Sequence, residues 1–216
     1  MFNAWNRALG PGVDVVPVEI GDRERFATLR QLTDEVSEQL RSELDGPHVF
    51  FGHSFGALLA YRLACLRVAS GSPPPRALMV SSFAPPNLPA PIPAVDHLDD
   101  HQLTALLSDL GGIPQELADW PALRDRAVAT ARIDLRLCAM DEEAEPVALS
   151  CPIHAFGGID DPLVTESDLY EWRSRTSGEF SVHTLAGGHF YLSDGPQFFA
   201  TLLPLLSRLP AVSEKC

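Results

Sequence analysis

Hydrophobic positions along the chain fall into short continuous runs and into longer runs with helical spacing. The short runs are rich in β-branched and aromatic residues, and they cover residues 13–20, 48–51, 76–86, 149–158 and 179–185. The longer runs carry apolar residues every third or fourth position, and they cover residues 28–44, 56–69, 166–176 and 196–209. Strand runs that alternate with helix runs predict an α/β fold with a mostly parallel sheet.

Residues 95–147 depart from this alternation. They show no strand pattern, but helical runs cover 99–110 and 121–140. We therefore predict one α/β domain over residues 1–216, with a helical lid inserted at about residues 87–147. A length of 216 residues is ordinary for one such domain.

The excess of acidic residues argues against negatively charged binding partners. Lys and Arg number 16 against 29 Asp and Glu, which gives a formal net charge of −13. Nucleic acids and anionic membrane surfaces need basic patches, so we expect neither as a partner. The four cysteines lack metal-ligand spacing and no run approaches the ~18 apolar residues of a membrane span, so we interpret the protein as cytoplasmic, with no metal and no cofactor.

One turn carries the pattern of a reactive serine. Ser54 stands in Gly52-His53-Ser54-Phe55-Gly56, directly after a predicted strand and before a predicted helix. In a G-x-S-x-G turn of this kind the serine is held in a strained backbone conformation that exposes its hydroxyl, and we expect side chains at either glycine to collide with the strand or the helix. The alternative interpretation is that Ser54 only caps the helix, for which two flanking glycines are not needed.

A serine hydroxyl needs a base within hydrogen-bonding distance. The candidates are His48, His53, His97, His101, His154, His183 and His189. His189 follows the last predicted strand on a glycine-flanked loop, where an α/β-hydrolase places its base. We expect His53 to point elsewhere, although it is next to the serine. The alternative for His189 is a capping role at the next helix.

The orienting acid is expected after the preceding strand. The segment "FGGIDDPLV" (156–164) supplies Asp160 and Asp161 there. Either carboxylate could accept a hydrogen bond from His189 and fix its tautomer. Asp161 is the first choice because it stands next to the proline that turns the loop, and Asp160 stays open as the alternative.

With these residues placed, the chain resembles the type II thioesterases, which are stand-alone editing hydrolases of polyketide and non-ribosomal peptide synthesis. The similar segments are "GHSFGALLAYRLA", "LLSDLGGIPQEL", "ATARIDLRLC", "CPIHAFGGIDDPLV" and "LAGGHFYL", which together span most of the chain. The resemblance implies an α/β-hydrolase fold with a lid over an acyl pocket. It also implies hydrolysis of acyl groups from the phosphopantetheine arm of acyl or peptidyl carrier proteins, with catalytic Ser54, Asp161 and His189 and with the backbone N–H of Phe55 in the oxyanion hole.

The chain departs from the family at its N-terminus. Family members begin with a strand and an "F-P-x-A-G-G"-like loop that supplies a second oxyanion N–H, and this strand would precede Met1. Its absence predicts a gap in the sheet between the strands at 13–20 and 48–51. Loss of one oxyanion donor lowers turnover by about 10²–10³-fold, so the resemblance also implies impaired activity unless the true start lies upstream.

Two other functions fit the same residues. A lidded esterase or an acyl-transferring cyclase would use the same triad, because water and an internal nucleophile compete for one acyl-enzyme. A non-catalytic homologue would keep the triad without using it. The lid decides between the first two, and its specificity is not readable from the sequence.

Overall fold

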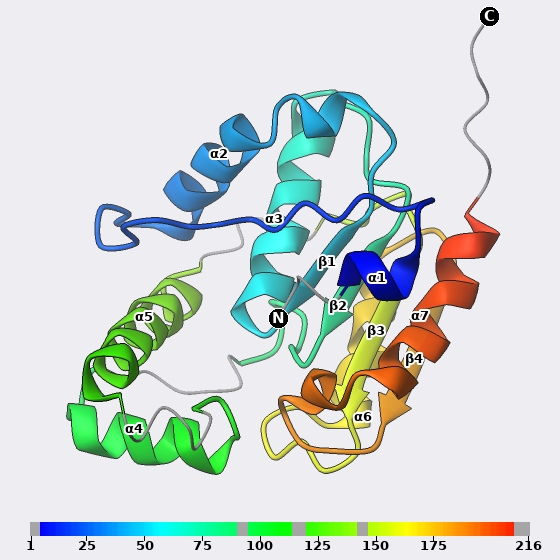
Figure 1. Cartoon of the computed structure of the whole chain (residues 1–216). Helices are drawn as coiled ribbons and strands as arrows, with labels where there is room; N and C mark the ends of the chain where they lie inside the picture. The colour runs from blue at the N-terminus through cyan, green and yellow to red at the C-terminus, as the bar shows by residue number, and fades with distance from the viewer. Residues whose placement is uncertain (1–4, 90–94, 114–119, 142–146, 210–216) are drawn as a thin grey trace, which may run out of the picture.

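A fully parallel four-stranded sheet forms the centre of the protein (Figure 1). The computed structural model describes residues 5–89, 95–113, 120–141 and 147–209. The strands are β1 (Phe50–His53), β2 (Leu78–Ser81), β3 (Ile153–Gly158) and β4 (Phe180–Leu185). They lie side by side in chain order, and every neighbouring pair is parallel. The predicted α/β fold class with a parallel sheet is confirmed.

Helices occupy the connections and both ends of the described chain. They are α1 (Trp5–Leu9), α2 (Leu29–Gln39), α3 (Phe55–Ala69), α4 (Asp100–Asp109), α5 (Pro121–Ala139), α6 (Glu166–Tyr170) and α7 (Pro196–Arg208), with 3₁₀ turns η2 (Glu43–Asp45), η4 (Glu171–Arg175) and η5 (Tyr191–Asp194). Helix α2 begins where the Thr28 side chain accepts a hydrogen bond from the Gln31 N–H. It is shorter than the predicted run 28–44, whose last residues form η2 instead.

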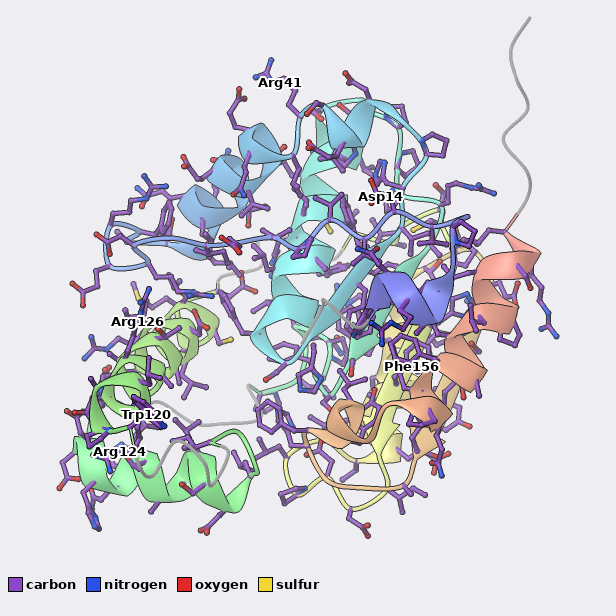
Figure 2. The ribbon with its side chains drawn as sticks, in the orientation of Figure 1. Asp14, Arg41, Trp120, Arg124, Arg126 and Phe156 are labelled. Carbon is purple, nitrogen blue, oxygen red and sulfur yellow. The ribbon has the colours of Figure 1, made fainter. Side chains whose placement is uncertain are left out.

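Two apolar cores lie on opposite faces of the sheet, because successive strand residues point to opposite sides. On one face Leu78 and Val80 belong to a core with residues of α2 and α3. On the other face Met79 and Phe156 belong to a core with residues of α1 and α7, and Figure 2 labels Phe156 there. Strands β2 and β3 are buried along their whole length, which is why their sequences are nearly continuous apolar runs.

The strand predicted at residues 13–20 is wrong. This segment contains no strand, and it crosses in front of α3 and β1 as an irregular chain (Figure 1). Its β-branched residues favour extended backbone, but a strand also needs a neighbour to hydrogen-bond, and Pro17 has no N–H to donate. We expected a gap between strands at 13–20 and 48–51. Because residues 13–20 form no strand, β1 is an edge of the sheet among the described residues.

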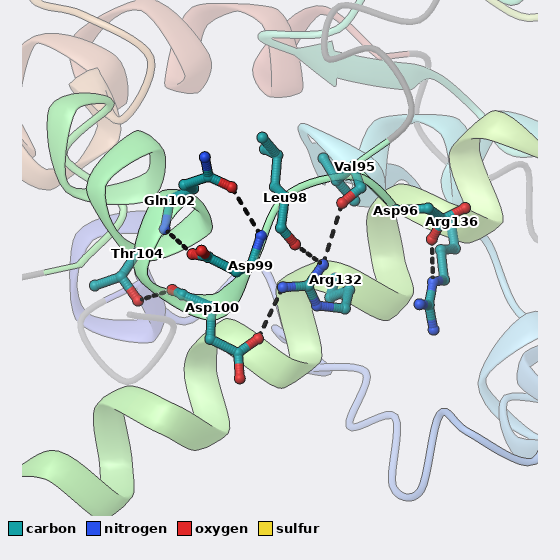
Figure 3. A network of polar contacts seen from close by, with 9 residues as sticks. All are labelled: Val95, Asp96, Leu98, Asp99, Asp100, Gln102, Thr104, Arg132 and Arg136. Carbon is teal, nitrogen blue, oxygen red and sulfur yellow. Dashed lines mark hydrogen bonds and ion pairs between the residues drawn. The ribbon is translucent and has the colours of Figure 1, made fainter.

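Helices α4 and α5 lie beside the sheet and carry their own apolar cluster around Leu103 and Val128 (Figure 1). Arg132 of α5 donates to the carbonyl oxygens of Val95 and Leu98 at 3.1 and 2.8 Å and pairs with Asp100 (Figure 3). These contacts tie the start of α4 to α5. The outer end of the pair, with Trp120 and Arg124, points away from the sheet (Figure 2).

The helical pattern predicted for residues 95–147 is therefore observed in the part of that segment that the structure describes. Residues 90–94, 114–119 and 142–146 of the expected lid lie outside the described residues.

Candidate active site

Ser54 stands on a sharp turn between β1 and α3. Its backbone has φ 53° and ψ −126°, a left-handed φ that few residues other than glycine adopt. A Cβ at Gly52 would collide with the carbonyl oxygen of Gly56 and lie 2.6 Å from the nitrogen of Ala57. Glycine is thus required at residue 52, where the strand passes close under the helix. The same prediction for Gly56 is wrong, because a Cβ there meets nothing within 4 Å.

Three side chains from distant parts of the sequence meet at this turn. The Nε2 atom of His189 lies 3.1 Å from the Oγ of Ser54, and its Nδ1 lies 2.9 and 3.1 Å from the two carboxylate oxygens of Asp161. His189 is 3% exposed and Asp161 is 7% exposed. The structure therefore brings together all three side chains that the sequence singled out.

The two neighbouring aspartates lie in different surroundings. The Asp161 carboxylate faces His189 and also accepts the N–H of Leu163 at 2.9 Å. Asp160 is exposed, and its backbone N–H donates to the carbonyl of Gly187 at 3.0 Å. Of the two alternatives, Asp161 is the one that contacts the histidine.

The electrostatics of the pair favour an ionised carboxylate. Burial by itself would raise the pKa of Asp161, but the hydrogen bond and the charge of His189, with the N–H of Leu163, hold that pKa below its usual value. An ionised Asp161 accepts a hydrogen bond from the N–H at Nδ1 of His189, and the proton stays on the histidine. The Nε2 atom of His189 is then free to accept the proton of Ser54.

The backbone N–H of Phe55 begins helix α3, immediately after Ser54. N–H groups in the first turn of a helix have no intrahelical acceptor, and the helix dipole adds partial positive charge there. An oxyanion formed on a carbonyl carbon bound to Ser54 would be stabilised at this position. The sequence-predicted role of Phe55 as an oxyanion donor is compatible with its place in the fold.

A cavity of about 540 Å³ opens at Ser54. Most of its lining is apolar, and α4 and α5 contribute Leu107, Leu110 and Leu135 to its walls. Phe55 also lines it, as expected for an acyl pocket. The cavity has the volume and the apolar lining for a hydrocarbon chain bound with its carbonyl at Ser54.

One charged pair in the cavity wall was not predicted from the sequence. The Nε of Arg23 lies 2.9 Å from the Oδ1 of Asp134 on α5, and both residues line the cavity. Burial raises the pKa of Asp134 to about 6, although Arg23 opposes this shift. The pair links the segment before α2 to helix α5 across the cavity.

Sequence reasoning also missed the residues that hold the triad in place. Ser82, with φ 48°, donates from its hydroxyl to the carbonyl oxygen of His189 at 3.2 Å. A Cβ at Gly158 would collide with the carbonyl oxygens of Gly187 and Gly188. This glycine therefore lets the loop after β3 that carries Asp161 (the acid loop) approach the loop after β4 that carries His189 (the histidine loop). The glycine pairs at 157–158 and 187–188 were the available signal.

The expectation that His53 points elsewhere is wrong. Its ring centroid lies 5.2 Å from that of His189 and 5.3 Å from that of Phe190. Burial, then the neighbouring His189, lowers the pKa of His53 to about 3, so its imidazole is neutral. His53 therefore lies beside the triad as a neutral side chain.

Within residues 5–89, 95–113, 120–141 and 147–209, no group of three or more His, Cys, Asp or Glu side chains could hold a metal ion. In the same part of the chain, no helix combines the length and hydropathy needed to cross a bilayer.

Comparison with known proteins identifies the family. Residues 1–205 match the thioesterase domain family. The chain is 31% identical over 212 residues to a Brevibacillus parabrevis protein named linear gramicidin dehydrogenase LgrE, covering 94% of this chain and 81% of that protein. The dehydrogenase in that name describes the relative alone.

Two solved thioesterase structures have the same fold. RedJ, from the prodiginine pathway of Streptomyces coelicolor, matches with a TM-score of 0.84 and 36% identity over 95% of this chain and 79% of RedJ. BorB, a type II thioesterase from the borrelidin cluster, matches with a TM-score of 0.81 and 31% identity over 95% of this chain and 85% of BorB. The predicted resemblance to type II thioesterases is thus confirmed, and the chain belongs to the thioesterase family.

Proposed function

We propose that this chain is an editing type II thioesterase that hydrolyses acyl groups from the phosphopantetheine arm of carrier proteins in a polyketide or non-ribosomal peptide pathway. The observation that carries the proposal is the contact of His189 with both Ser54 and Asp161 at the mouth of an apolar cavity. Relatives named for prodiginine, borrelidin and gramicidin S biosynthesis support the pathway class.

The first half of the reaction forms an acyl-enzyme. His189 Nε2 takes the proton of Ser54 as its Oγ attacks the thioester carbonyl carbon, and the carbonyl oxygen becomes an oxyanion at the Phe55 N–H. Asp161 stabilises the imidazolium that forms. The C–S bond then breaks, and the imidazolium gives its proton to the departing pantetheine thiolate.

The second half releases the acid. A water molecule loses a proton to His189 Nε2 and attacks the acyl-Ser54 carbonyl carbon. The new tetrahedral oxyanion collapses, the bond to Ser54 Oγ breaks, and the imidazolium returns its proton to that oxygen. The free carboxylic acid leaves and the enzyme is regenerated. Every proton in both halves passes through side chains of this chain, so the reaction needs no metal and no cofactor.

We assign the lid role to the segment at about residues 87–147. Support comes from Leu107, Leu110 and Leu135, which place α4 and α5 in the wall of the cavity that holds Ser54. The hydrogen bonds from Arg132 to the segment before α4 connect the two helices of the proposed lid (Figure 3). An acyl chain would then be enclosed between this lid and the sheet.

The proposed partner is an acyl or peptidyl carrier protein in the cytoplasm. Carrier proteins of these pathways are acidic, and this chain has a net charge of −13, so long-range attraction cannot drive their association. We therefore propose a weak, mostly apolar contact near the lid. Raising the salt concentration should leave carrier-dependent turnover unchanged or slightly higher, and a strong loss would contradict this mode of docking.

The deciding experiment compares three substrates with the same acyl group, namely an acyl carrier protein thioester, an acyl pantetheine and an aryl ester. The proposal predicts the highest kcat/KM for the carrier thioester, with free acid as the product. Preference for the aryl ester would indicate a general esterase, and a cyclised product would indicate an acyl transferase. A fluorophosphonate that fails to label Ser54 in the folded protein would indicate a non-catalytic homologue.

A further inference from the structure

Two buried hydroxyl groups connect the end of β1, the end of β2 and the loop of His189 beside the triad. The Nδ1 of His53 lies 2.9 Å from the Oγ of Ser81, and that Oγ lies 2.7 Å from the phenol oxygen of Tyr191. Ser81 is fully buried and Tyr191 is 4% exposed. This hydrogen-bond chain therefore joins the serine turn, the end of β2 and the histidine loop.

Counting unpaired groups gives the direction of this hydrogen-bond chain. If Tyr191 donates to Ser81 and Ser81 donates to Nδ1 of His53, both hydroxyl protons are used and His53 carries its proton on Nε2. Nε2 of His53 has no hydrogen-bond partner among the described residues in either direction, and in the reverse direction the buried Tyr191 O–H is unpaired as well. Unpaired buried polar groups are unfavourable, so the first direction is preferred.

The surroundings of His53 agree with a neutral ring. His189 and Phe190 contact it from the histidine loop, Tyr191 lies 6.3 Å away between ring centroids, and Ser81 bonds it from β2. Burial is the main cause of the lowered pKa of His53, the charge of His189 adds to it, and the carboxylate of Asp161 opposes both. Burial also raises the pKa of Tyr191, which stays a neutral donor.

The same series of hydrogen bonds restrains His189, the catalytic base. Tyr191 follows His189 by two residues, and its backbone N–H donates to the carbonyl of Gly188 at 3.2 Å. Ser82, adjacent to Ser81, bonds the carbonyl oxygen of His189. The last residue of β2 and its successor thus hold the histidine loop at two points.

We infer that Ser81 and Tyr191 are positioning residues for the proposed thioester hydrolysis. Their hydroxyl groups fix the histidine loop against the serine turn and hold His53 as a neutral, Nε2-protonated imidazole against the ring of His189. A proton gained by His189 during the reaction then meets no second cation. The inference rests on the proposed function where it concerns thioester hydrolysis. The positions of the histidine loop and of the His53 proton do not depend on which substrate is used.

The test compares Tyr191→Phe and Ser81→Ala with a matched control. Ser181 bridges Nδ1 of His154 and Nε2 of His183 at 2.7 Å each, near the opposite ends of the strands from Ser54. Ser181→Ala therefore removes a similar histidine–hydroxyl bridge away from the triad. Thermal midpoints identify any variant that has lost stability, and Tyr191→Phe, which keeps the ring, carries the test if Ser81→Ala does not fold.

The first readout is the rate at which a fluorophosphonate labels Ser54. Tyr191→Phe should slow labelling about tenfold, less than the ~10²-fold that a 1 Å misplacement can cause, while Ser181→Ala should match the unmodified chain. The second readout is nitrogen NMR of the histidine rings, which should show His53 with its proton on Nε2 and a mixture of tautomers in Tyr191→Phe.

Three results would overturn the inference. They are an unchanged labelling rate in Tyr191→Phe, an equal loss in Ser181→Ala, and a His53 ring that carries its proton on Nδ1 in the unmodified protein. Failure of the proposed function is distinguishable, because the unmodified protein itself would then not react at Ser54 or would not hydrolyse carrier thioesters.

Discussion

Replacing Asp161 by asparagine is the sharpest test of the triad, because the structure dictates how the new amide must lie. The Oδ1 of Asp161 accepts the Leu163 N–H at 2.9 Å, so the amide oxygen of the new side chain has to stay on that side. The amide NH₂ then takes the place of Oδ2, which lies 2.9 Å from Nδ1 of His189. A donor at this contact, which is shorter than the 3.1 Å from Nδ1 to Oδ1, favours an accepting Nδ1 and places the proton of His189 on Nε2.

The expected loss is large because the wrong nitrogen is protonated. With its proton on Nε2, His189 cannot accept the proton of Ser54 across their 3.1 Å contact. The same substitution in a serine protease triad lowers kcat about 10⁴-fold. That factor corresponds to about 5 kcal/mol of transition-state stabilisation. The fold should be retained, because asparagine has the same shape and keeps the Leu163 hydrogen bond.

The assay is steady-state hydrolysis of an acyl pantetheine, with thermal unfolding measured on the same samples. Asp160→Asn is the matched control, since it neutralises the exposed neighbour and should leave kcat unchanged. A drop of only a few fold in Asp161→Asn, with the fold intact, would refute the role of Asp161. A large loss in Asp160→Asn alone would transfer that role to the neighbouring carboxylate.

Two further predictions concern stability. Gly52→Ala places a Cβ against the backbone of Gly56, so urea unfolding should show a loss of about 3 kcal/mol, the upper end of the usual cost of overpacking. Gly56→Ala should be neutral or stabilising by up to about 1 kcal/mol. Equal effects of the two substitutions would contradict the close approach at residue 52. The partly buried carboxyl of Asp134 has a folded pKa of about 6, above its unfolded value near 4. Its contribution to stability is therefore full below pH 4 and is lost as the pH rises through 6. In Asp134→Asn the unfolding free energy should change by about 1–3 kcal/mol less between pH 4 and pH 6 than in the unmodified protein. Parallel plots of unfolding free energy against pH for the two proteins would show that Asp134 is not the responsible group.

Periodicity and turn chemistry were sufficient for most of the architecture. The runs that became β2 and β3 were recognisable because buried parallel strands are continuous apolar segments, and α3 because it is apolar on nearly every side. Residues 13–20 look like a strand by the same criteria but are not one. Propensity is local, whereas a strand exists only if a neighbour is available, and the sequence of the segment does not report its neighbours.

The triad residues could be predicted because a reactive serine and its partners need unusual turns and particular places at strand ends. Ser54 was found because a positive φ at a non-glycine residue needs a particular turn, and His189 and Asp161 because they follow strands whose ends share one edge of the sheet. Ser81 and Ser82 gave no comparable signal. They end an ordinary apolar strand, and their contacts cross more than a hundred residues to the histidine loop.

This difference separates the residues that react from those that hold them. A nucleophile and its base must be chemically special, so their residue types and turns mark them in a sequence. Their precise separation depends on groups without special chemistry, such as the Ser82 hydroxyl and the missing side chain of Gly158, which lets two loops touch. Because the 3.1 Å contact of His189 with Ser54 is set by these supports, variants at Gly158 should lose activity by displacing His189, although no atom of Gly158 takes part in the reaction.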